Sequence, residues 1–283
     1  ELFVIIAITL PFVLLPVRAG KVLGLMLYYF WRRRREIAIE NVRRACSSGA
    51  ITGKPEEIIR KNFEELGQSI IEIVKIYFGR GKGILDNISF KGLENIEKAK
   101  NKGRGIIFIT GHCGNWELLA LATSLKITPV SVVVRRLNNP LLNNLIERLR
   151  SRYGNTVIYK RGALKEIIKT LRRNGSVGIL IDQAVLPEEG IIVDFLGRPA
   201  WTTKMPVLIA KKTGSPILPV FIKRNNKGQE ITIYPEVMLL SNNNEYLTEN
   251  TRRLNSFIED FIRENPEQWL WIHRRWKRTG QND

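Results

Sequence analysis

Cysteine and histidine are scarce in this 283-residue chain, which contains only two of each. Cys46 and Cys113 have no second pair at metal-ligand spacing, so the sequence indicates neither a disulfide framework nor a zinc site. His112 and His273 are the only histidines, and any imidazole chemistry must therefore use one or both of them. We expect a protein built for a reducing compartment, without a metal.

A hydrophobic run long enough to cross a membrane is also missing at the start of the chain. Residues 2–17 are uncharged, but this stretch is just short of the roughly 20 residues that a spanning helix needs. A second apolar piece, 22–31, is closed by the arginines at 32–35. Positive charges after an apolar stretch favour an uncleaved anchor over a secretory signal, and they place the rest of the chain on the cytoplasmic side. We expect residues 1–35 to be a membrane anchor that spans or lies on the bilayer; the alternative is a buried helix hairpin.

Acidic residues are few beside basic ones, 27 against 45, which gives a formal charge of +18. Such a charge predicts attraction to nucleic acid, anionic lipid or a phosphorylated substrate, or merely a solvated basic surface. No helix-turn-helix, RNP or zinc-finger pattern is present, and arginines cluster beside the apolar N-terminal segment. We therefore expect a membrane and an anionic substrate as partners, and no nucleic acid.

The pattern of apolar residues changes along the chain. Residues 36–48 and 56–78 have the periodicity of amphipathic helices, and a Gly-bounded charged stretch near 79–84 ends that region. After it, short buried-strand runs alternate with helical segments, which predicts an α/β fold with a central, mostly parallel sheet flanked by helices on both faces. The expected units are an anchor at 1–35, a helical arm at 36–83 and an α/β catalytic domain at 84–283. The predicted strands are 88–90, 105–110, 130–134, 157–159, 177–182, 217–223 and 231–234, and the predicted helices are 116–126, 139–151, 163–173, 203–213 and 246–264.

The segment GHCGNWELL at 111–119 directly follows one predicted strand and precedes a helix, the place where active-site groups gather. Glu117 lies five positions after His112, so its carboxylate can fold back onto one ring nitrogen while the other faces a substrate hydroxyl. That pair would be a general base with its orienting acid. The alternative is an ordinary turn histidine with an acid favoured by the helix dipole. A thiolate nucleophile at Cys113 is disfavoured, because adjacent loop residues usually point apart.

The same segment resembles the H-x-x-x-x-E signature of the lipid A biosynthesis acyltransferases, a branch of the lysophospholipid acyltransferase superfamily. Further similar segments follow in the family's order: two arginines after VSVVV, Asp182 and Gln183 after VGILI, FLGRPAWT at 195–202 and WLWIHRRWK at 269–277. The IAIENVRRA segment at 37–45 is similar too, so the resemblance covers nearly the whole chain. Cys113 departs from the family, which often has an aromatic residue there.

The resemblance implies an O-acyltransferase that moves a fatty acyl chain from an acyl carrier protein or coenzyme A thioester to a hydroxyl of a lipid A precursor. It further implies an inner-membrane location with the catalytic domain on the cytoplasmic face, and no cofactor. His112 would be the base and Glu117 its partner. Residues expected to bind substrate or shape its cleft are Arg135, Arg136, Asp182, Asn115, Phe195, Gly197 and Thr202.

Other functions fit part of the same pattern. The H-x-x-x-x-acid machinery also serves enzymes that acylate a lysophospholipid or a phosphatidylinositol mannoside, and a non-catalytic basic membrane-binding module is a further alternative. The aromatic and cationic residues at 269–277 suit a membrane interface or an anionic headgroup, with His273 packed among the tryptophans. The sequence leaves the acyl chain length, the acylated position and the oligomeric state open.

Overall fold

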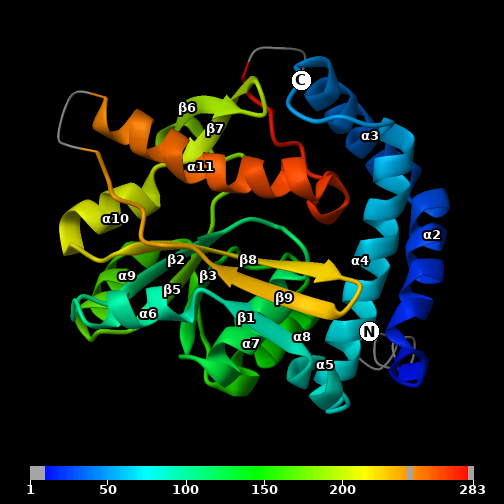
Figure 1. Ribbon diagram of the computed structural model, residues 1–283, viewed down its shortest axis with the longest axis horizontal. Coiled ribbons are helices and arrows are strands. Elements are labelled where there is room, and N and C mark those ends of the chain that lie inside the picture. Colours follow the sequence, from blue (N-terminus) through cyan, green and yellow to red (C-terminus); the bar gives the residue numbers. More distant parts are fainter. Residues whose placement is uncertain (1–9, 241–244, 280–283) are drawn as a thin grey trace.

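The computed structural model describes residues 10–240 and 245–279, and its centre is a seven-stranded sheet in the order β1-β9-β8-β2-β5-β3-β4 (Figure 1). Strands β8, β2, β5, β3 and β4 are parallel to one another, whereas β9 and β1 run the opposite way. The carboxyl ends of five strands therefore meet at one edge, and the predicted mostly parallel α/β sheet is confirmed. The strands are β1 (Ile88–Lys91), β2 (Ile106–Thr110), β3 (Val130–Val134), β4 (Thr156–Tyr159), β5 (Ser176–Leu180), β8 (Ile217–Asn225) and β9 (Gly228–Ile233).

Helices cover both faces of the sheet, as the buried strands require. Alternate side chains of β2 show the division: Ile107 and Ile109 belong to one apolar cluster, and Ile106 and Phe108 belong to the other. The first cluster is completed by α9 (Ala163–Arg172), α10 (Met205–Thr213) and α11 (Tyr246–Glu264). The second is completed by α6 (Leu93–Lys100), α7 (Trp116–Lys126) and α8 (Pro140–Arg150). The prediction of helices on both faces is confirmed.

The longest helix, α4 (Pro55–Tyr77), runs beside the sheet, with α2 (Gly20–Phe30) packed along its outer side (Figure 1). The two helices approach closely because glycines face each other. A Cβ on Gly24 would lie 2.0 Å from the carbonyl oxygen of Phe63, and a Cβ on Gly67 would lie 2.0 Å from that of Gly20. Helix α3 (Arg32–Ser47) follows α2, and the short α5 (Lys82–Asp86) follows α4.

The predicted anchor at 1–35 is described only in part, because residues 1–9 lie outside the described residues. Between residues 10 and 279, among those described, no helix combines the length and the apolar character needed to cross a bilayer. The chain before α2 forms two single turns of 3-10 helix, η1 (Leu10–Val13) and η2 (Val17–Ala19). Helix α2 packs on α4 and keeps its outer face exposed.

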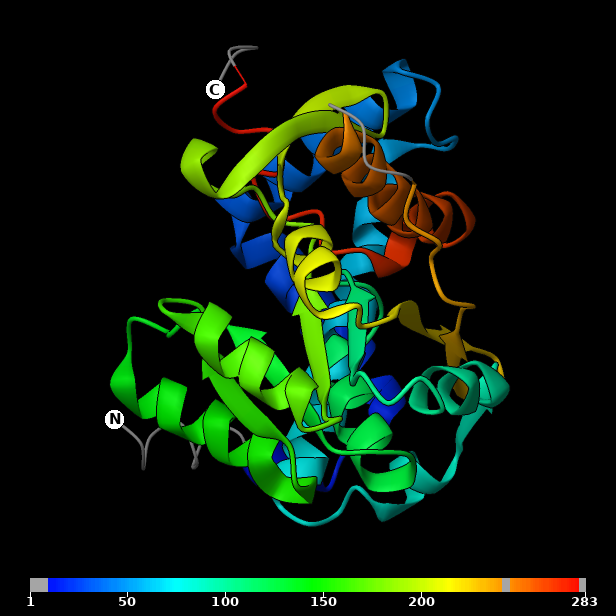
Figure 2. The same cartoon turned by 90° about the vertical axis from the view of Figure 1, so that its left-hand side faces the viewer.

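An antiparallel hairpin that the sequence did not predict, β6 (Gly190–Phe195) and β7 (Arg198–Thr203), packs on α11. In both views the hairpin and the orange α11 lie near α3, at one end of the molecule (Figure 1, Figure 2). After α11, the turn η5 (Pro266–Gln268) leads into a C-terminal segment, residues 268–279, which returns to the end of β2. This segment becomes part of the site described next.

Candidate active site

His112 and Asp182 face each other because the parallel register of β2 and β5 places them side by side. The two strands end with Thr110 opposite Leu180, and each of the two polar residues lies two positions beyond that pair. His112 Nδ1 lies 2.8 Å from Asp182 Oδ1, and the backbone amide of His112 donates to Asp182 Oδ2 at 2.8 Å. The carboxyl edge of the sheet thus holds an imidazole–carboxylate pair, as expected for an α/β site.

Asp182 is 2 % exposed and remains ionised because three donors surround it. Burial by itself raises the pKa of a carboxyl group. The charge of His112 and hydrogen bonds from His112 and from the Trp269 indole, whose Nε1 donates to Oδ2 at 2.8 Å, outweigh burial and lower the pKa of Asp182 to about 2. At neutral pH, therefore, the imidazole has an ionised carboxylate partner.

The other ring nitrogen of His112 is directed away from Asp182. When Nδ1–H donates to the carboxylate, Nε2 is an acceptor, and the amide nitrogen of Gln183 lies 3.1 Å from it. The His112 side chain is 18 % exposed, at a small opening between α4 and the C-terminal segment. A hydroxyl that entered this opening would meet an imidazole oriented by a carboxylate, which is the arrangement of a general base.

Glu117 does not pair with His112, which corrects the expected dyad. Helix α7 begins at Trp116 and directs the Glu117 carboxylate toward α8, where it accepts from Arg150 Nε at 2.9 Å and from Nη2 of the same guanidinium. Burial by itself lowers the pKa of Arg150, but the hydrogen bonds and the charge of Glu117 outweigh burial and raise the pKa of Arg150. The carboxylate that orients His112 comes instead from Asp182, 70 residues further along the chain.

Asn115 has a structural position as the N-cap of α7. Its Oδ1 accepts from the amide of Leu118 at 3.2 Å, and its Nδ2 donates to the buried Glu72 at 2.8 Å. Glu72 is also bound by Arg224, at the end of β8, through both terminal guanidinium nitrogens. These contacts join α4, β8 and α7 around the His112 loop.

The two predicted arginines separate after β3, and both are exposed. Arg136 lies over the ring of Tyr159, 5.1 Å from its centroid. Arg135 lies toward the C-terminal segment, because its charge contributes to the lowered pKa of Lys277. Burial is the largest cause of that lowering, and the charges of Arg278, Arg135 and Arg274 follow. Arg135 is therefore the one that joins a group of cations.

The predicted cleft residues of FLGRPAWT belong to the hairpin and its core instead. Phe195 and Thr202 are completely buried, and neither lines a described opening. Phe195 packs against Trp269, and Thr202 Oγ1 accepts from Arg275 Nη2 at 2.5 Å. Gly197 has a φ of +76° in the hairpin turn, which lies against α3. We expected these residues to contact substrate or shape its cleft; the structure corrects this, because Phe195 and Thr202 instead support the C-terminal segment.

The C-terminal aromatic residues are core residues, which corrects their expected place at a membrane interface. Trp269, Trp271 and Trp276 are at most 5 % exposed, and Arg275 is fully buried over the ring of Phe195. His273 lies nearby, and burial lowers its pKa to about 4, so it is neutral at pH 7. The run of aromatic and cationic residues in this segment therefore packs around Asp182.

Cys113 is fully buried and directly follows His112 in the chain. Burial, together with the negative charge of Asp182, raises the pKa of its thiol well above the usual value. A thiolate nucleophile is therefore unfavourable there. Among residues 10–240 and 245–279, His, Cys, Asp and Glu side chains form no group of three that could hold a metal ion.

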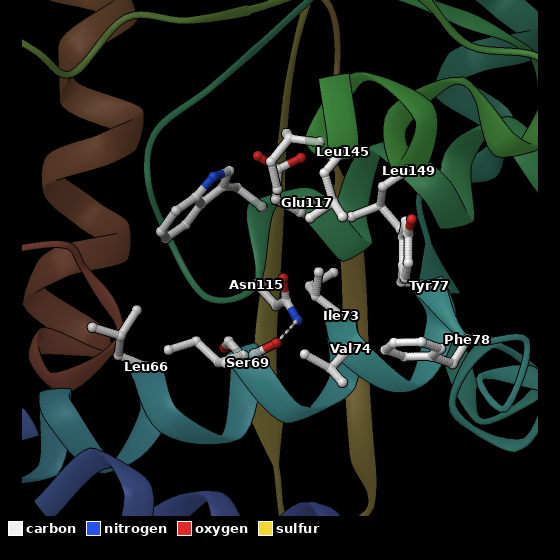
Figure 3. A pocket seen from close by; sticks show the side chains of 13 residues that line it. Leu66, Ser69, Ile73, Val74, Tyr77, Phe78, Asn115, Glu117, Leu145 and Leu149 are labelled. Atoms are coloured by element: carbon white, nitrogen blue, oxygen red, sulfur yellow. Dashed lines mark hydrogen bonds between the residues drawn. The ribbon is translucent and has the colours of Figure 1, made fainter. Parts of the chain in front are cut away.

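An apolar groove of about 260 Å³ lies next to the His112 opening (Figure 3). Leu66, Ser69 and Trp116 line both spaces, so the groove and the opening adjoin. One wall of the groove is α4, with Tyr77 and Phe78 at the end of that helix, and α7 and α8 supply the opposite wall. The lining residues are Leu66, Ser69, Ile70, Ile73, Val74, Tyr77, Phe78, Asn115, Trp116, Glu117, Leu145, Ile146 and Leu149.

Sequence reasoning assigned no role to Arg150 or Gln183, and it placed Trp269 at a membrane interface or an anionic headgroup rather than at Asp182. Gln183 follows the strand-end aspartate and could have been considered for that reason. Arg150 is one of two arginines in its helix, and its partner Glu117 is 33 positions away. Trp269 lies 87 positions from Asp182, and only the return of the C-terminal segment brings the two together.

The fold and this site define an α/β protein with an imidazole–carboxylate pair beside an apolar groove. The family model described as bacterial lipid A biosynthesis acyltransferase matches residues 2–278. A lipid A biosynthesis acyltransferase of Haemophilus influenzae is 27 % identical over 95 % of this chain and 84 % of its own length. In Escherichia coli, a lipid A biosynthesis lauroyltransferase is 28 % identical over 92 % of this chain and 84 % of its own, and a palmitoleoyltransferase is 27 % identical over 91 % and 83 %. The chain belongs to the bacterial lipid A biosynthesis acyltransferase family and is an O-acyltransferase.

Proposed function

We propose that this enzyme transfers a fatty acyl chain from an acyl carrier protein thioester to a hydroxyl of a lipid A precursor. The observation that carries the proposal is the His112–Asp182 pair, whose imidazole lines an opening that adjoins an apolar groove. The names of the relatives support a lipid A precursor over the lysophospholipid and phosphatidylinositol mannoside alternatives. An arranged base and its carboxylate argue against a purely binding module.

In the proposed reaction, His112 Nε2 takes the proton of the acceptor hydroxyl, and the oxygen attacks the thioester carbonyl. Asp182 stabilises the imidazolium that forms. The tetrahedral intermediate then collapses: the new ester bond remains, the carbon–sulfur bond breaks, and the thiolate recovers a proton from the imidazolium. No covalent enzyme intermediate is required.

Stabilisation of the oxyanion would come from the start of α7. The backbone amides of Trp116 and Glu117 donate to no described residue, whereas the amide of Leu118 is capped by Asn115. Free N–H groups in the first helical turn, at the positive end of the helix dipole, suit a developing negative charge. Trp116 lines both the His112 opening and the groove, so this residue lies where the two spaces meet.

The acyl chain would lie in the groove between α4, α7 and α8. Its lining is almost entirely aliphatic and aromatic, which suits a hydrocarbon chain. A chain that entered past Trp116 would leave its thioester beside His112 and direct its methyl end toward Tyr77 and Phe78 (Figure 3). The net charge of +18 would attract both a phosphorylated glycolipid and an acidic carrier protein.

The outer face of α2 supports association with the cytoplasmic face of the inner membrane. Val22, Met26, Tyr29 and Phe30 are exposed on one helix, and the exposed Arg32 and Arg33 follow directly. Apolar side chains beside cations suit an interface with anionic lipid. Flotation with anionic and neutral vesicles would test this, because binding should require the anionic lipid.

The decisive experiment is transfer by the purified protein in detergent, with defined acyl carrier protein thioesters and a lipid A precursor, read by mass spectrometry. His112→Ala should lose roughly 10³-fold or more in rate while it keeps its fold and vesicle binding. His273→Ala is the matched control, because it removes the second imidazole. Full transfer by His112→Ala would contradict the proposal.

A further inference from the structure

We propose that Trp269 is a positioning residue of the reaction, because its indole N–H holds the second oxygen of Asp182 and so fixes the carboxylate that orients His112. The inference rests on the proposed function. It assigns a chemical task to a tryptophan that lies outside the strand-end motifs.

The contact is direct and enclosed. Trp269 Nε1 lies 2.8 Å from Asp182 Oδ2, while Asp182 Oδ1 faces the imidazole, so each carboxylate oxygen has its own ring partner. Trp269 is 1 % exposed, and no water can replace the indole as donor without an opening of the core. Rotation of the carboxylate would break both ring contacts at once.

Trp269 is itself fixed by the loop that it serves. The amide of Leu270 donates to the carbonyl of His112 at 3.0 Å, and the amide of Gly114 donates to the carbonyl of Gln268, so the segment pairs with the His112 loop as a short antiparallel bridge. On the other side, Asn62 of α4 donates to the carbonyl of Trp269 at 2.7 Å. The same three residues, 268–270, thus set the backbone of the base and the side chain of its partner.

Loss of the indole N–H would change the acid–base behaviour of the pair in a predictable direction. A carboxylate with one donor fewer is more basic and attracts the imidazolium form of His112 more strongly. The base would then lose its proton only at a higher pH, and the acid-side midpoint of kcat/KM would move upward. Other titratable groups around the pair are Cys113, His273 and Arg275, with Glu65 and Glu267 at the opening, and the substitution removes none of them.

Trp271 provides a matched control within the same cluster. It is fully buried, its ring centroid lies 4.6 Å from that of Trp269, and its Nε1 donates to the carbonyl of Pro266 rather than to Asp182. Trp269→Phe and Trp271→Phe each remove one buried indole and its hydrogen bond. Only the first removes a donor to the catalytic carboxylate.

The experiment is the pH profile of kcat/KM for acyl transfer by the full chain carrying each substitution. For Trp269→Phe we expect the acid-side midpoint to rise by about one pH unit and kcat at pH 7 to fall about tenfold, with KM for the acyl donor unchanged. Trp271→Phe should lower the thermal midpoint of unfolding about as much as Trp269→Phe does, but it should leave the pH profile of kcat/KM unchanged. Since Trp269→Phe also creates a cavity, Trp269 is replaced in a second protein by 3-benzothienylalanine, which keeps the bicyclic ring and lacks the N–H.

The benzothienyl protein should show the same shift with a nearly unchanged thermal midpoint. An unshifted profile in that protein, or an equal shift in Trp271→Phe, would reduce Trp269 to a packing residue and overturn the inference. His112→Ala is measured alongside. If it retained transfer, the proposed function itself would fail, whatever the tryptophan variants did.

Discussion

The opening at His112 and the groove beside it share three lining residues, yet they are built in opposite ways. At the opening, the Asp182 carboxylate faces three donors and His112 has a partner on each ring nitrogen. In the groove, aliphatic and aromatic side chains from three helices face one another, and few contacts are directional. Hydrogen bonds at the ends of β2 and β5 thus fix the His112 imidazole and its carboxylate, whereas the shape of the groove would select the lipid chain.

The largest effect should come from substitution of the two carboxylates, Asp182 and Glu117. Comparing the two variants distinguishes the acid that orients His112 from the acid that pairs with Arg150. Asp182→Asn should cost roughly 10³ to 10⁴ in kcat, because an amide cannot stabilise the imidazolium and can impose the wrong tautomer. Glu117→Gln weakens a partly exposed ion pair with Arg150 and should cost on the order of tenfold. Rates with a saturating acyl donor provide the test. Equal losses in the two variants would remove the distinction between them.

A smaller, selective effect should follow when the groove is shortened. Val74→Phe adds a ring to the α4 wall and should disfavour longer acyl chains relative to shorter ones by about tenfold, with catalysis on short chains retained. Competition between acyl carrier protein thioesters of different length measures that ratio. Leu164→Phe, at an exposed position on α9, is the control and should leave the ratio unchanged. An unaltered ratio in Val74→Phe would place the acyl chain elsewhere.

The smallest effect should be that of Cys113→Ala. The thiol is buried and its pKa is raised, so its removal should leave kcat nearly unchanged and lower the free energy of unfolding by about 1 kcal/mol. Transfer assays before and after treatment with a thiol reagent provide a second reading. Loss of transfer in Cys113→Ala at normal stability would instead support a thioester intermediate on this residue.

Much of the fold was predictable because its signals are local. Each strand of the large sheet reads as a short apolar run, and α7 and α11 begin and end where their periodicity predicts. The β6–β7 hairpin was missed, since its strands mix apolar with charged and proline residues and its turn uses Leu196 at a φ of +54°. The strand-end location of His112 and Asp182 was visible too, but their pairing was not, because the neighbours of a parallel strand depend on the crossovers.

The sequence by itself determined the strands of the large sheet, most of the helices, the polar residues at the strand ends and the family to which the chain belongs, since periodicity and motifs are local properties. Only the tertiary structure decided which acid serves His112. Strand β2 lies between β8 and β5, and that order brings Asp182 to the imidazole, while α7 directs the nearer Glu117 to Arg150. Glu117 is only five positions from His112 in the chain, but Asp182 is its neighbour in space. The pairing of β2 with β5 fixes where the two strand ends lie, and His112 and Asp182 each follow their strand by two residues.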